Sequence, residues 1–359
     1  MVKILKCSMF GEFVHLASRV ANQTLTDTVH SSFVVKYPIN MEQAQQLLKD
    51  IAVLEEKMIF MIDSSHPEFQ FFFQNAEGQS MSLAQSMLVL FENKDEIPLI
   101  DKDKWALYLT YFLSNLLTEE VAEEDMKKGV SLPKDELVSK LIRSDLPDTL
   151  KYRFMILLEN PQKLLNHLFA MFEEIRENWT KHQKEFDQLI KANLKRFESM
   201  SESDLIAYVE KTISIRSVPS SQTIAVAPSV FNYNALYFTD SPWYEYHGTA
   251  MVWNIGVKIF DIFEMINSTS DQKQRLATAL KVLSDQSKLE ILMLCKDTPQ
   301  YGVNLAKELK LTSATVSYHI NTLVNLGYLT MNMEGNRIYY KTQKERIQAD
   351  LQSISDLLD

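Results

Sequence analysis

Residues 311–323, which read L-T-S-A-T-V-S-Y-H-I-N-T-L, constrain the fold of this chain more than any other stretch. Val316, Ile320 and Leu323 recur at the spacing of one helical face, so a helix here would bury them together. Thr312 can cap the start of that helix through its hydroxyl group. The opposite face carries small polar side chains, which can approach base edges and phosphates in a major groove. The pattern therefore favours a helix that reads DNA over an enzyme surface.

The flanking segments predict a fixed order of elements around this helix. Ser287 and Glu290 have the spacing of a capping box, and Gly327 can end the helix in a left-handed conformation. Gly335 and Asn336 suit the tight turn of a β-hairpin. The expected elements are helices over residues 275–283, from 287, over 302–309 and over 312–326, then paired strands over 328–333 and 337–342.

Four motifs occur in order within this segment: L-S-D-Q-S-K-L-E-I-L, N-L-A-K-E-L, T-V-S-Y-H-I-N-T-L-V-N-L-G-Y-L and E-G-N-R-I-Y-Y. As an ordered set over about 75 of the 359 residues, they make the segment similar to the ArsR-type winged helix-turn-helix of bacterial transcriptional regulators. The resemblance implies a homodimer whose two recognition helices enter successive major grooves of a palindromic operator on double-stranded DNA. Repression is the expected outcome, because a dimer on a promoter blocks polymerase without a further surface. Activation stays open.

The resemblance also implies roles for individual residues. The base-facing positions of the family fall on Ser313, Ala314, Thr315, Ser317 and Tyr318, and its wing-tip phosphate contact falls on Arg337. His319 occupies a position where the family often has histidine, which implies a structural or phosphate-contact role and not a metal ligand. The full set of expected DNA contacts is Lys307, Lys310, Thr312, Ser313, Ala314, Thr315, Ser317, Tyr318, His319, Asn321, Asn336, Arg337 and Lys341.

Charge is unevenly distributed along the chain. The formal net charge is -10, yet residues 271–345 contain ten Lys and Arg against seven Asp and Glu, so this segment carries about +3 and the remainder about -13. A few basic side chains neutralise only a few phosphates, which predicts a shallow dependence of DNA affinity on salt. This modest charge leaves open a winged helix that contacts proteins instead of DNA.

No metal or cofactor site is predicted. Many ArsR-type regulators sense metals through a cysteine pair before the recognition helix, or through carboxylates and histidines on the C-terminal helix. Here residues 302–309 contain no cysteine and the tail after residue 343 contains no histidine. Cys295, alone in an apolar helix, is expected to be a core residue. Zinc and soft metals need converging thiolates or imidazoles, which this segment does not offer.

The rest of the chain predicts a large, mainly helical body with a small sheet, so the fold class is α+β, mainly α. Helices are expected over residues 41–64, 104–122, 161–197 and 201–215, and strands over 32–37, 223–227, 230–238 and 244–252. The polar stretch 267–271 predicts a domain boundary. The expected domains are an N-terminal sensor or dimerisation domain over 1–266, the winged helix-turn-helix over 272–342 and a C-terminal dimerisation helix over 343–359.

The C-terminal helix carries an apolar stripe that must be buried somewhere. Ile347, Leu351, Ile354 and Leu358 recur at helical spacing. A dimer partner is the expected place, with packing on the N-terminal domain of the same chain as the alternative.

The N-terminal domain offers no catalytic motif, so the chain is expected not to be an enzyme. The seven histidines of the chain lack metalloprotease spacing, and neither a G-x-S-x-G motif nor a glycine-rich phosphate loop occurs. Residues 226–243, with Trp179, resemble the large N-terminal domain of some ArsR-type regulators of Gram-positive bacteria. An enzyme with an appended winged helix, or a scaffold without an effector, remains the alternative.

Aromatic residues are frequent between positions 231 and 253, and they suggest a pocket for a small-molecule or peptide effector. Plain sheet core is the competing interpretation of the same residues. The expected pocket residues are Tyr233, Tyr237, Trp243, Tyr246 and Trp253.

The sequence contains no apolar run of membrane-spanning length, and its first residues lack the pattern of a cleaved leader. Its two cysteines cannot build a disulfide framework. A cytoplasmic protein without a membrane partner is therefore expected.

Overall fold

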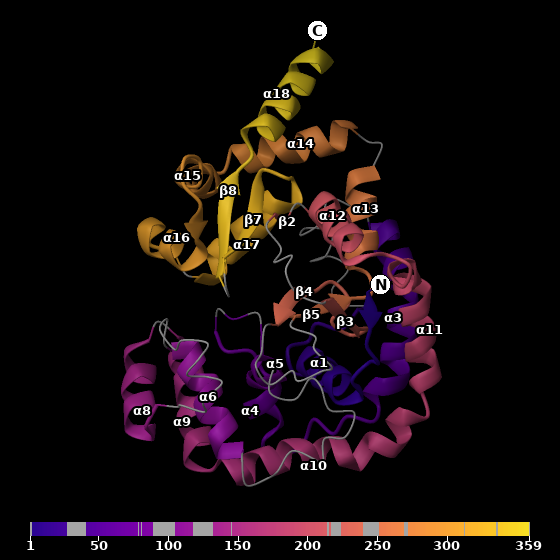
Figure 1. The fold of residues 1–359 in the computed structure, drawn as a ribbon, viewed down its shortest axis with the longest axis vertical. Coiled ribbons are helices and arrows are strands. Elements are labelled where there is room, and N and C mark those ends of the chain that lie inside the picture. The colour runs from indigo at the N-terminus through magenta and orange to yellow at the C-terminus, as the bar shows by residue number, and fades with distance from the viewer. Residues whose placement is uncertain are drawn as a thin grey trace.

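The computed structural model describes residues 2–26, 41–77, 79, 81–88, 105–117, 132–144, 146–213, 215–216, 224–239, 251–268, 272–311, 313–334 and 337–358. Helices dominate this part of the chain, and its strands form two four-stranded sheets, which confirms the α+β, mainly α class. Figure 1 shows the C-terminal elements at one end of the molecule, with the last helix pointing away from the body. Among the described helices, none is both long and apolar enough to cross a bilayer.

The N-terminal helices follow the apolar periodicity of the sequence, with shifted ends. The helix that starts at Pro161 ends at Thr180, and a new one begins at Gln183, so the single run expected over 161–197 is wrong. Ser201 and Asp204 form a capping box before the helix that begins at Glu202: the Asp204 N–H donates to the Ser201 hydroxyl at 3.1 Å, and the Ser201 N–H donates to the Asp204 carboxylate at 3.3 Å. The helices are α1 Met9–Ala21, α3 Met41–Ile59, α4 Phe69–Phe73, α5 Leu83–Met87, α6 Trp105–Leu117, α8 Lys134–Arg143, α9 Asp148–Glu159, α10 Pro161–Thr180, α11 Gln183–Leu194, the 3-10 helix η4 Lys195–Phe197, α12 Glu202–Ile213 and α13 Ile259–Ser268.

The first sheet lies in the N-terminal region and has the order β1-β3-β5-β4. β1 (Lys3–Ile4), β3 (Ile224–Ser229) and β5 (Met251–Gly256) are parallel, and β4 (Leu236–Thr239) pairs antiparallel with β5. Residues 231–234 form a turn, so only the last part of the strand expected over 230–238 is found, as β4. The strand expected over 32–37, and most of the one over 244–252, lie outside the described residues.

Gly256 permits a close backbone approach at the end of this sheet. A Cβ atom at this position would lie 2.3 Å from the Asn232 carbonyl oxygen and 2.5 Å from that of Tyr233. Only glycine fits where two backbones come this close. The turn over 231–234 is therefore held directly against the end of β5.

The C-terminal elements appear in the predicted order. They are α14 Gln272–Leu283, α15 Gln286–Leu294, β6 Gln300–Tyr301, α16 Gly302–Leu309, α17 Ser313–Asn325, β7 Leu329–Glu334, β8 Arg337–Thr342 and α18 Lys344–Leu358. The predicted cap of α15 is wrong by two residues. Asp285, not Ser287, is the N-cap, because its carboxylate accepts the Lys288 N–H at 3.0 Å.

Buried residues form two separate hydrophobic clusters. The larger contains buried side chains from Val2 to Phe263, and the smaller contains those from Ala279 to Leu329. Met331 packs at the edge of both clusters. Two cores support a domain boundary near residue 270, which stays a prediction.

One short strand crosses that expected boundary. β2 (Ile215–Arg216) follows α12 in the chain, yet it pairs parallel with Met331 and Asn332 of β7. The second sheet thus has the order β2-β7-β8-β6, and its edge strand comes from the N-terminal part of the chain. Periodicity could not predict this pairing, because two residues carry no pattern.

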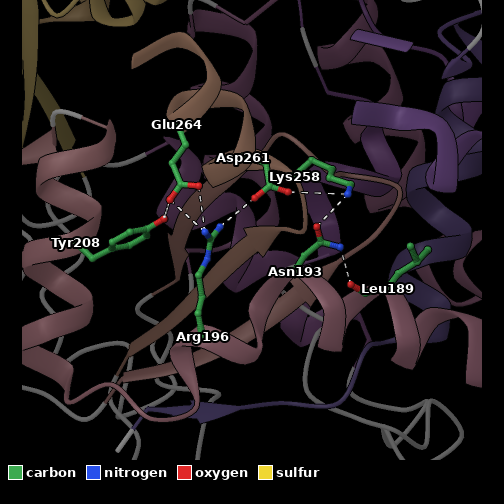
Figure 2. Close-up of polar contacts among 7 residues, drawn as sticks. All are labelled: Leu189, Asn193, Arg196, Tyr208, Lys258, Asp261 and Glu264. Atoms are coloured by element: carbon green, nitrogen blue, oxygen red, sulfur yellow. Dashed lines mark hydrogen bonds and ion pairs between the residues drawn. The ribbon is translucent and has the colours of Figure 1, made fainter. Parts of the chain in front are cut away.

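A polar cluster around Arg196 joins the helices that lead into the C-terminal elements (Figure 2). Its guanidinium donates to both carboxylate oxygens of Glu264 at 3.1 Å and to Asp261 at 3.1 Å. The Tyr208 hydroxyl also donates to Glu264, and the Arg196 guanidinium lies 5.5 Å from the Tyr208 ring centroid. Lys258 bonds Asn193 at 2.9 Å beside this group. Tyr208 belongs to α12, which leads to β2, and Glu264 belongs to α13, which leads to α14.

Candidate DNA-binding site

A tight turn joins α16 to α17 and presents two lysines. α16 ends at Leu309, its C-cap residue Lys310 has a left-handed φ of 54°, and the Leu311 N–H donates to the Ala306 carbonyl at 3.1 Å. Lys307 and Lys310 are exposed at this turn. Both predicted phosphate contacts therefore lie beside the start of α17.

α17 separates its apolar and polar faces as predicted. Its buried stripe is Val316, Ile320 and Leu323, each at most 3% exposed. Its exposed side chains are Ser317, Tyr318 and Asn321, with Tyr318 50% exposed. Thr315 is half-buried. The helix is one residue shorter at each end than the expected 312–326, which is within the ordinary uncertainty of helix ends.

Some expected contacts can be placed only in part. Ser313 and Ala314 begin α17 and Arg337 begins β8, but their side chains are outside the described residues. Thr312 and Asn336 lie outside the described residues altogether.

His319 packs toward α15 and is only half exposed. Its ring centroid lies 5.7 Å from that of Tyr318, and its buried Nδ1 has no hydrogen-bond partner among the described residues. Burial, helped by the nearby Lys288 ammonium, holds the pKa of His319 below its usual value. A neutral imidazole fits the structural role better than a charged phosphate contact.

Lys288, paired with Asp285, lies beside Tyr318 on the exposed face of α17, a contact that the sequence pattern did not predict. The Lys288 ammonium bonds the Asp285 carboxylate at 2.7 Å and lies 5.8 Å from the Tyr318 ring centroid. Lys288 is only 8% exposed, so its charge is held at a fixed place. The available signal was the opposite charge pair at i, i+3 at the start of α15.

The end of α17 is fixed in two ways. Gly327 has a φ of 75°, as predicted for a left-handed helix end, and its N–H donates to the Val324 carbonyl at 2.8 Å. The next residue, Tyr328, is fully buried, and its hydroxyl donates to Asp350 of α18 at 3.0 Å. The recognition helix and the C-terminal helix are thereby coupled through one residue.

β7 and β8 form the predicted wing. Their antiparallel register pairs Glu334 with Arg337 at the tip and Thr330 with Lys341 nearer the base. Lys341 is exposed. β6 pairs with the other side of β8, so the wing is anchored to the strand that precedes α16.

The helix-turn-helix and its wing match known proteins. The family model for bacterial regulatory proteins of the arsR family matches residues 285–330. An arsenical resistance operon repressor from Staphylococcus xylosus is 35% identical over 72 residues, which cover 20% of this chain and 69% of the relative. The chain belongs to the ArsR family. A second arsenical resistance operon repressor, from Staphylococcus aureus, is 34% identical over 68 residues, which cover 19% of this chain and 65% of the relative.

The ArsR match concerns the C-terminal module, which is that of a DNA-binding transcriptional regulator. The chain spans about two thirds of the length of these two relatives, and their matched segments make up about a fifth of this chain. The family model starts at the N-cap of α15 and ends at the second residue of β7. It therefore includes α16 and α17 but neither β8 nor the N-terminal region.

The one cysteine of this ArsR module is a core residue, as expected. Cys295 is fully buried, and burial raises the pKa of its thiol to about 12. The described part of the chain contains no group of three or more His, Cys, Asp or Glu side chains placed to hold a metal ion.

The structure describes three of the five expected effector residues, Tyr233, Tyr237 and Trp253. Tyr233 and Trp253 are buried in the larger hydrophobic cluster, and Tyr237 on β4 is half-buried. The Arg19 guanidinium lies 4.9 Å from the Tyr233 ring centroid. Trp243 and Tyr246 lie outside the described residues. The pocket stays a prediction, and the placement of Tyr233 and Trp253 supports the sheet-core interpretation of those two residues.

Proposed function

We propose that this protein is a homodimeric transcriptional repressor that reads a palindromic operator with α17 and contacts its backbone with the wing. The observation that carries the proposal is the two-sided character of α17. Its apolar stripe is buried, and Ser317, Tyr318 and Asn321 face outward. Side chains of this size suit direct contact with base edges in a major groove.

The position of the lysines supports this orientation. Lys307 and Lys310 lie at the turn before α17, and Lys341 lies on the wing, so exposed positive charge lies before and after the recognition helix along the chain. Such a helix needs flanking phosphate contacts to fix its register on DNA. The small number of these lysines predicts an affinity that falls only moderately with salt.

Exposed leucines on α14 and α18 support the homodimer. Leu280 on α14 and Leu351 and Leu357 on α18 are between 46% and 48% exposed. Ile347, from the predicted stripe, instead packs against the smaller cluster of its own chain. α18 points away from the body of the molecule, where a second copy can reach it (Figure 1). Exposed leucines on these two helices are available for association with a second copy.

The N-terminal region is proposed to carry the signal input. Two segments lead from it into the ArsR module: α13 continues to α14, and β2 pairs with the wing strand β7. A movement of α12 would therefore be transmitted through β2 to the wing, and a movement of α13 would be transmitted to α14 at the start of the module. An effector would act by binding more tightly to one of two conformations that differ in the positions of α12 and α13.

The deciding experiment is selection of DNA fragments by the purified full chain, followed by affinity measurements at several salt concentrations. We expect enrichment of a palindrome with half-sites about one helical turn apart. Arg337→Ala should weaken binding to all sequences and reduce the salt slope by about one. Failure to enrich any sequence would favour a winged helix that contacts proteins.

The dimer surface is tested by sedimentation of Leu351→Glu. We expect this variant to be monomeric, because a carboxylate at an apolar interface is costly to bury. Ile142→Glu is the matched control, since Ile142 is 58% exposed on α8 in the N-terminal region. A wild-type chain that sediments as a monomer would contradict the homodimer, and an unchanged Leu351→Glu dimer would contradict this surface.

A further inference from the structure

A cavity lies at the base of the wing, on the side where β8 runs into α18. Its volume is about 480 Å³, within the range of small-molecule sites. Four elements contribute to it: the turn after α15, the two wing strands and the first residues of α18. The lining residues are Lys296, Thr330, Asn332, Lys341, Thr342, Gln343, Lys344 and Glu345.

The cavity has the charge of an anion site. Lys296, Lys341 and Lys344 come from three different segments and line it, and among the described lining residues Glu345 is the only acidic one. Within the part of the chain that the structure describes, no carboxylate forms an ion pair with any of the three lysines. Lysine ammonium groups are compact charges with three donors each, and phosphate is their usual ligand.

The start of α18 adds to this preference. α18 is fifteen residues long, and its first residues, Lys344 and Glu345, line the cavity. The first backbone N–H groups of a helix have no partner within the helix and carry a partial positive charge. Three lysines beside such a helix end make a site for a multiply charged anion.

The floor of the cavity is held in place by its own hydrogen bonds. The Thr342 hydroxyl donates to the Leu292 carbonyl at 2.7 Å, and its N–H donates to the Cys295 carbonyl at 3.0 Å. The Gln343 side-chain amide donates to the Thr330 hydroxyl at 3.0 Å. A ligand would therefore meet preformed walls and would not need to order them.

Most of the cavity lies outside the proposed DNA contacts. Lys341, four residues and roughly 13 Å along an extended strand from Arg337 at the tip, is the one lining residue named here that is also a proposed contact with DNA. Lys296 and Lys344 do not belong to that set. The volume also exceeds what one backbone phosphate needs.

We propose that this cavity binds a small phosphate-bearing molecule. The phosphate lies among the three lysines and the start of α18, and the remaining space holds the rest of the molecule. Binding itself does not depend on the proposed function. If the chain is a repressor, the ligand would also stabilise the junction of β8 and α18 and so couple to the wing.

The test uses the full chain, with pyrophosphate as the probe, in isothermal titration calorimetry at constant ionic strength. We expect the wild type to bind pyrophosphate. The Lys296→Gln/Lys344→Gln double variant should bind it at least about tenfold more weakly. Glu345→Gln should bind several-fold more tightly, because it removes a negative side chain from the cavity lining. Lys281→Gln, at an exposed position of α14, is the matched control and should leave binding unchanged.

Misfolding can weaken binding but cannot tighten it. Tighter binding by Glu345→Gln would therefore support the site even if the double variant were misfolded. Absence of heat with the wild type at millimolar pyrophosphate would overturn the proposal. Equal loss in Lys281→Gln would also overturn it, because binding would then follow net charge alone. Displacement of pyrophosphate by an operator duplex would overturn the cavity proposal and assign the lysines to DNA binding. If the chain bound pyrophosphate but not DNA, only the proposed repressor function would be overturned.

Discussion

α1 and α17 are both thirteen residues long, but α1 buries polar side chains whereas α17 exposes them. On α1, Glu12, His15 and Ser18 are at most 4% exposed. On α17, the apolar stripe is buried and Ser317 and Asn321 face outward. Buried polar groups need partners inside the protein, whereas exposed ones are available to another molecule. The comparison separates a helix that holds the body together from one that recognises a partner.

The polar groups of α1 find their partners far along the chain. The Glu12 carboxylate accepts the N–H groups of Val230 at 2.9 Å and Phe231 at 2.7 Å. Arg19 Nε lies 3.0 Å from Glu55 Oε1, and its guanidinium also donates to the Phe231 carbonyl at 3.1 Å. Thus α1 connects α3 to the turn between β3 and β4.

The largest expected effect is on the stability of this interior network. Glu55→Ala would leave the Arg19 guanidinium buried without its carboxylate, since the two side chains are 11% and 6% exposed. We expect a loss of about 3–5 kcal/mol in the free energy of unfolding, measured by urea denaturation.

Lys57→Ala on the same helix is the control for this loss. Lys57 pairs with Glu185 at 3.0 Å, but their side chains are 48% and 36% exposed. An exposed pair contributes at most about 1 kcal/mol. Similar losses for the two variants would show that the Arg19–Glu55 pair does not hold α1 in place.

The second effect is a loss of stability in acid caused by His15. Burial and the nearby Arg19 lower the pKa of His15 to about 3, from an ordinary value of 6.5. Between these values the unfolded chain binds a proton that the folded chain does not, so stability falls as pH falls below about 6.5. The expected slope is about 1.4 kcal/mol per pH unit, or about 2 kcal/mol from pH 6.5 to 5.

The measurement is urea denaturation of wild type and His15→Gln at pH 7, 6 and 5. Glutamine does not titrate, so the difference in slope between the two proteins isolates His15. This subtraction matters because burial raises the pKa of Glu12, which makes its own contribution fall as pH rises. Parallel pH profiles for the two proteins would remove His15 as the cause.

The two helices also differ in how well the sequence predicts them. α17 is predictable because Val316, Ile320 and Leu323 segregate from the polar residues, and because Gly327 marks its end. α1 was not predicted, because its polar and apolar residues share one buried surface. The partners that make this possible lie at sequence separations of 36 to 219 residues, beyond any local pattern.

The candidate site shows the same limit. The exposed face of α17 and the wing strands follow from local spacing, and the structure places them as expected. The support of Tyr318 by Lys288 and the pairing of β2 with β7 depend on segments that meet only in the folded chain. Local periodicity therefore predicts the elements that face outward better than the contacts that position them.

The third effect concerns recognition by α17 and not stability. Ser317→Glu places a negative charge on the exposed face, and we expect at least about tenfold weaker operator binding, with a free energy of unfolding changed by less than about 0.5 kcal/mol. Gln162→Glu, on the exposed first turn of α10, makes the same change in charge in the N-terminal region. Equal weakening by both variants, in fluorescence anisotropy with labelled operator, would show an effect of net charge and not of contact.

The smallest effect is expected where the two regions meet, at Arg196. Arg196→Lys keeps the charge but cannot bond Glu264 and Asp261 from two separate nitrogens, and it loses the guanidinium contact with the Tyr208 ring. Because Arg196 is about one third exposed, we expect a loss in unfolding free energy of no more than about 1 kcal/mol. The more sensitive readout is amide hydrogen exchange of Met331 and Asn332, which pair with β2 and should exchange several-fold faster.

Arg176→Lys is the matched control for this last prediction. Arg176 also donates to both oxygens of a glutamate, Glu173, at 3.1 and 3.2 Å, but both lie on α10. Its replacement should therefore leave exchange in β7 unchanged. If Arg196→Lys also leaves β7 unchanged, the Arg196 cluster stabilises α12 and α13 without affecting the wing. The input to the module would then pass through α13 and α14 alone.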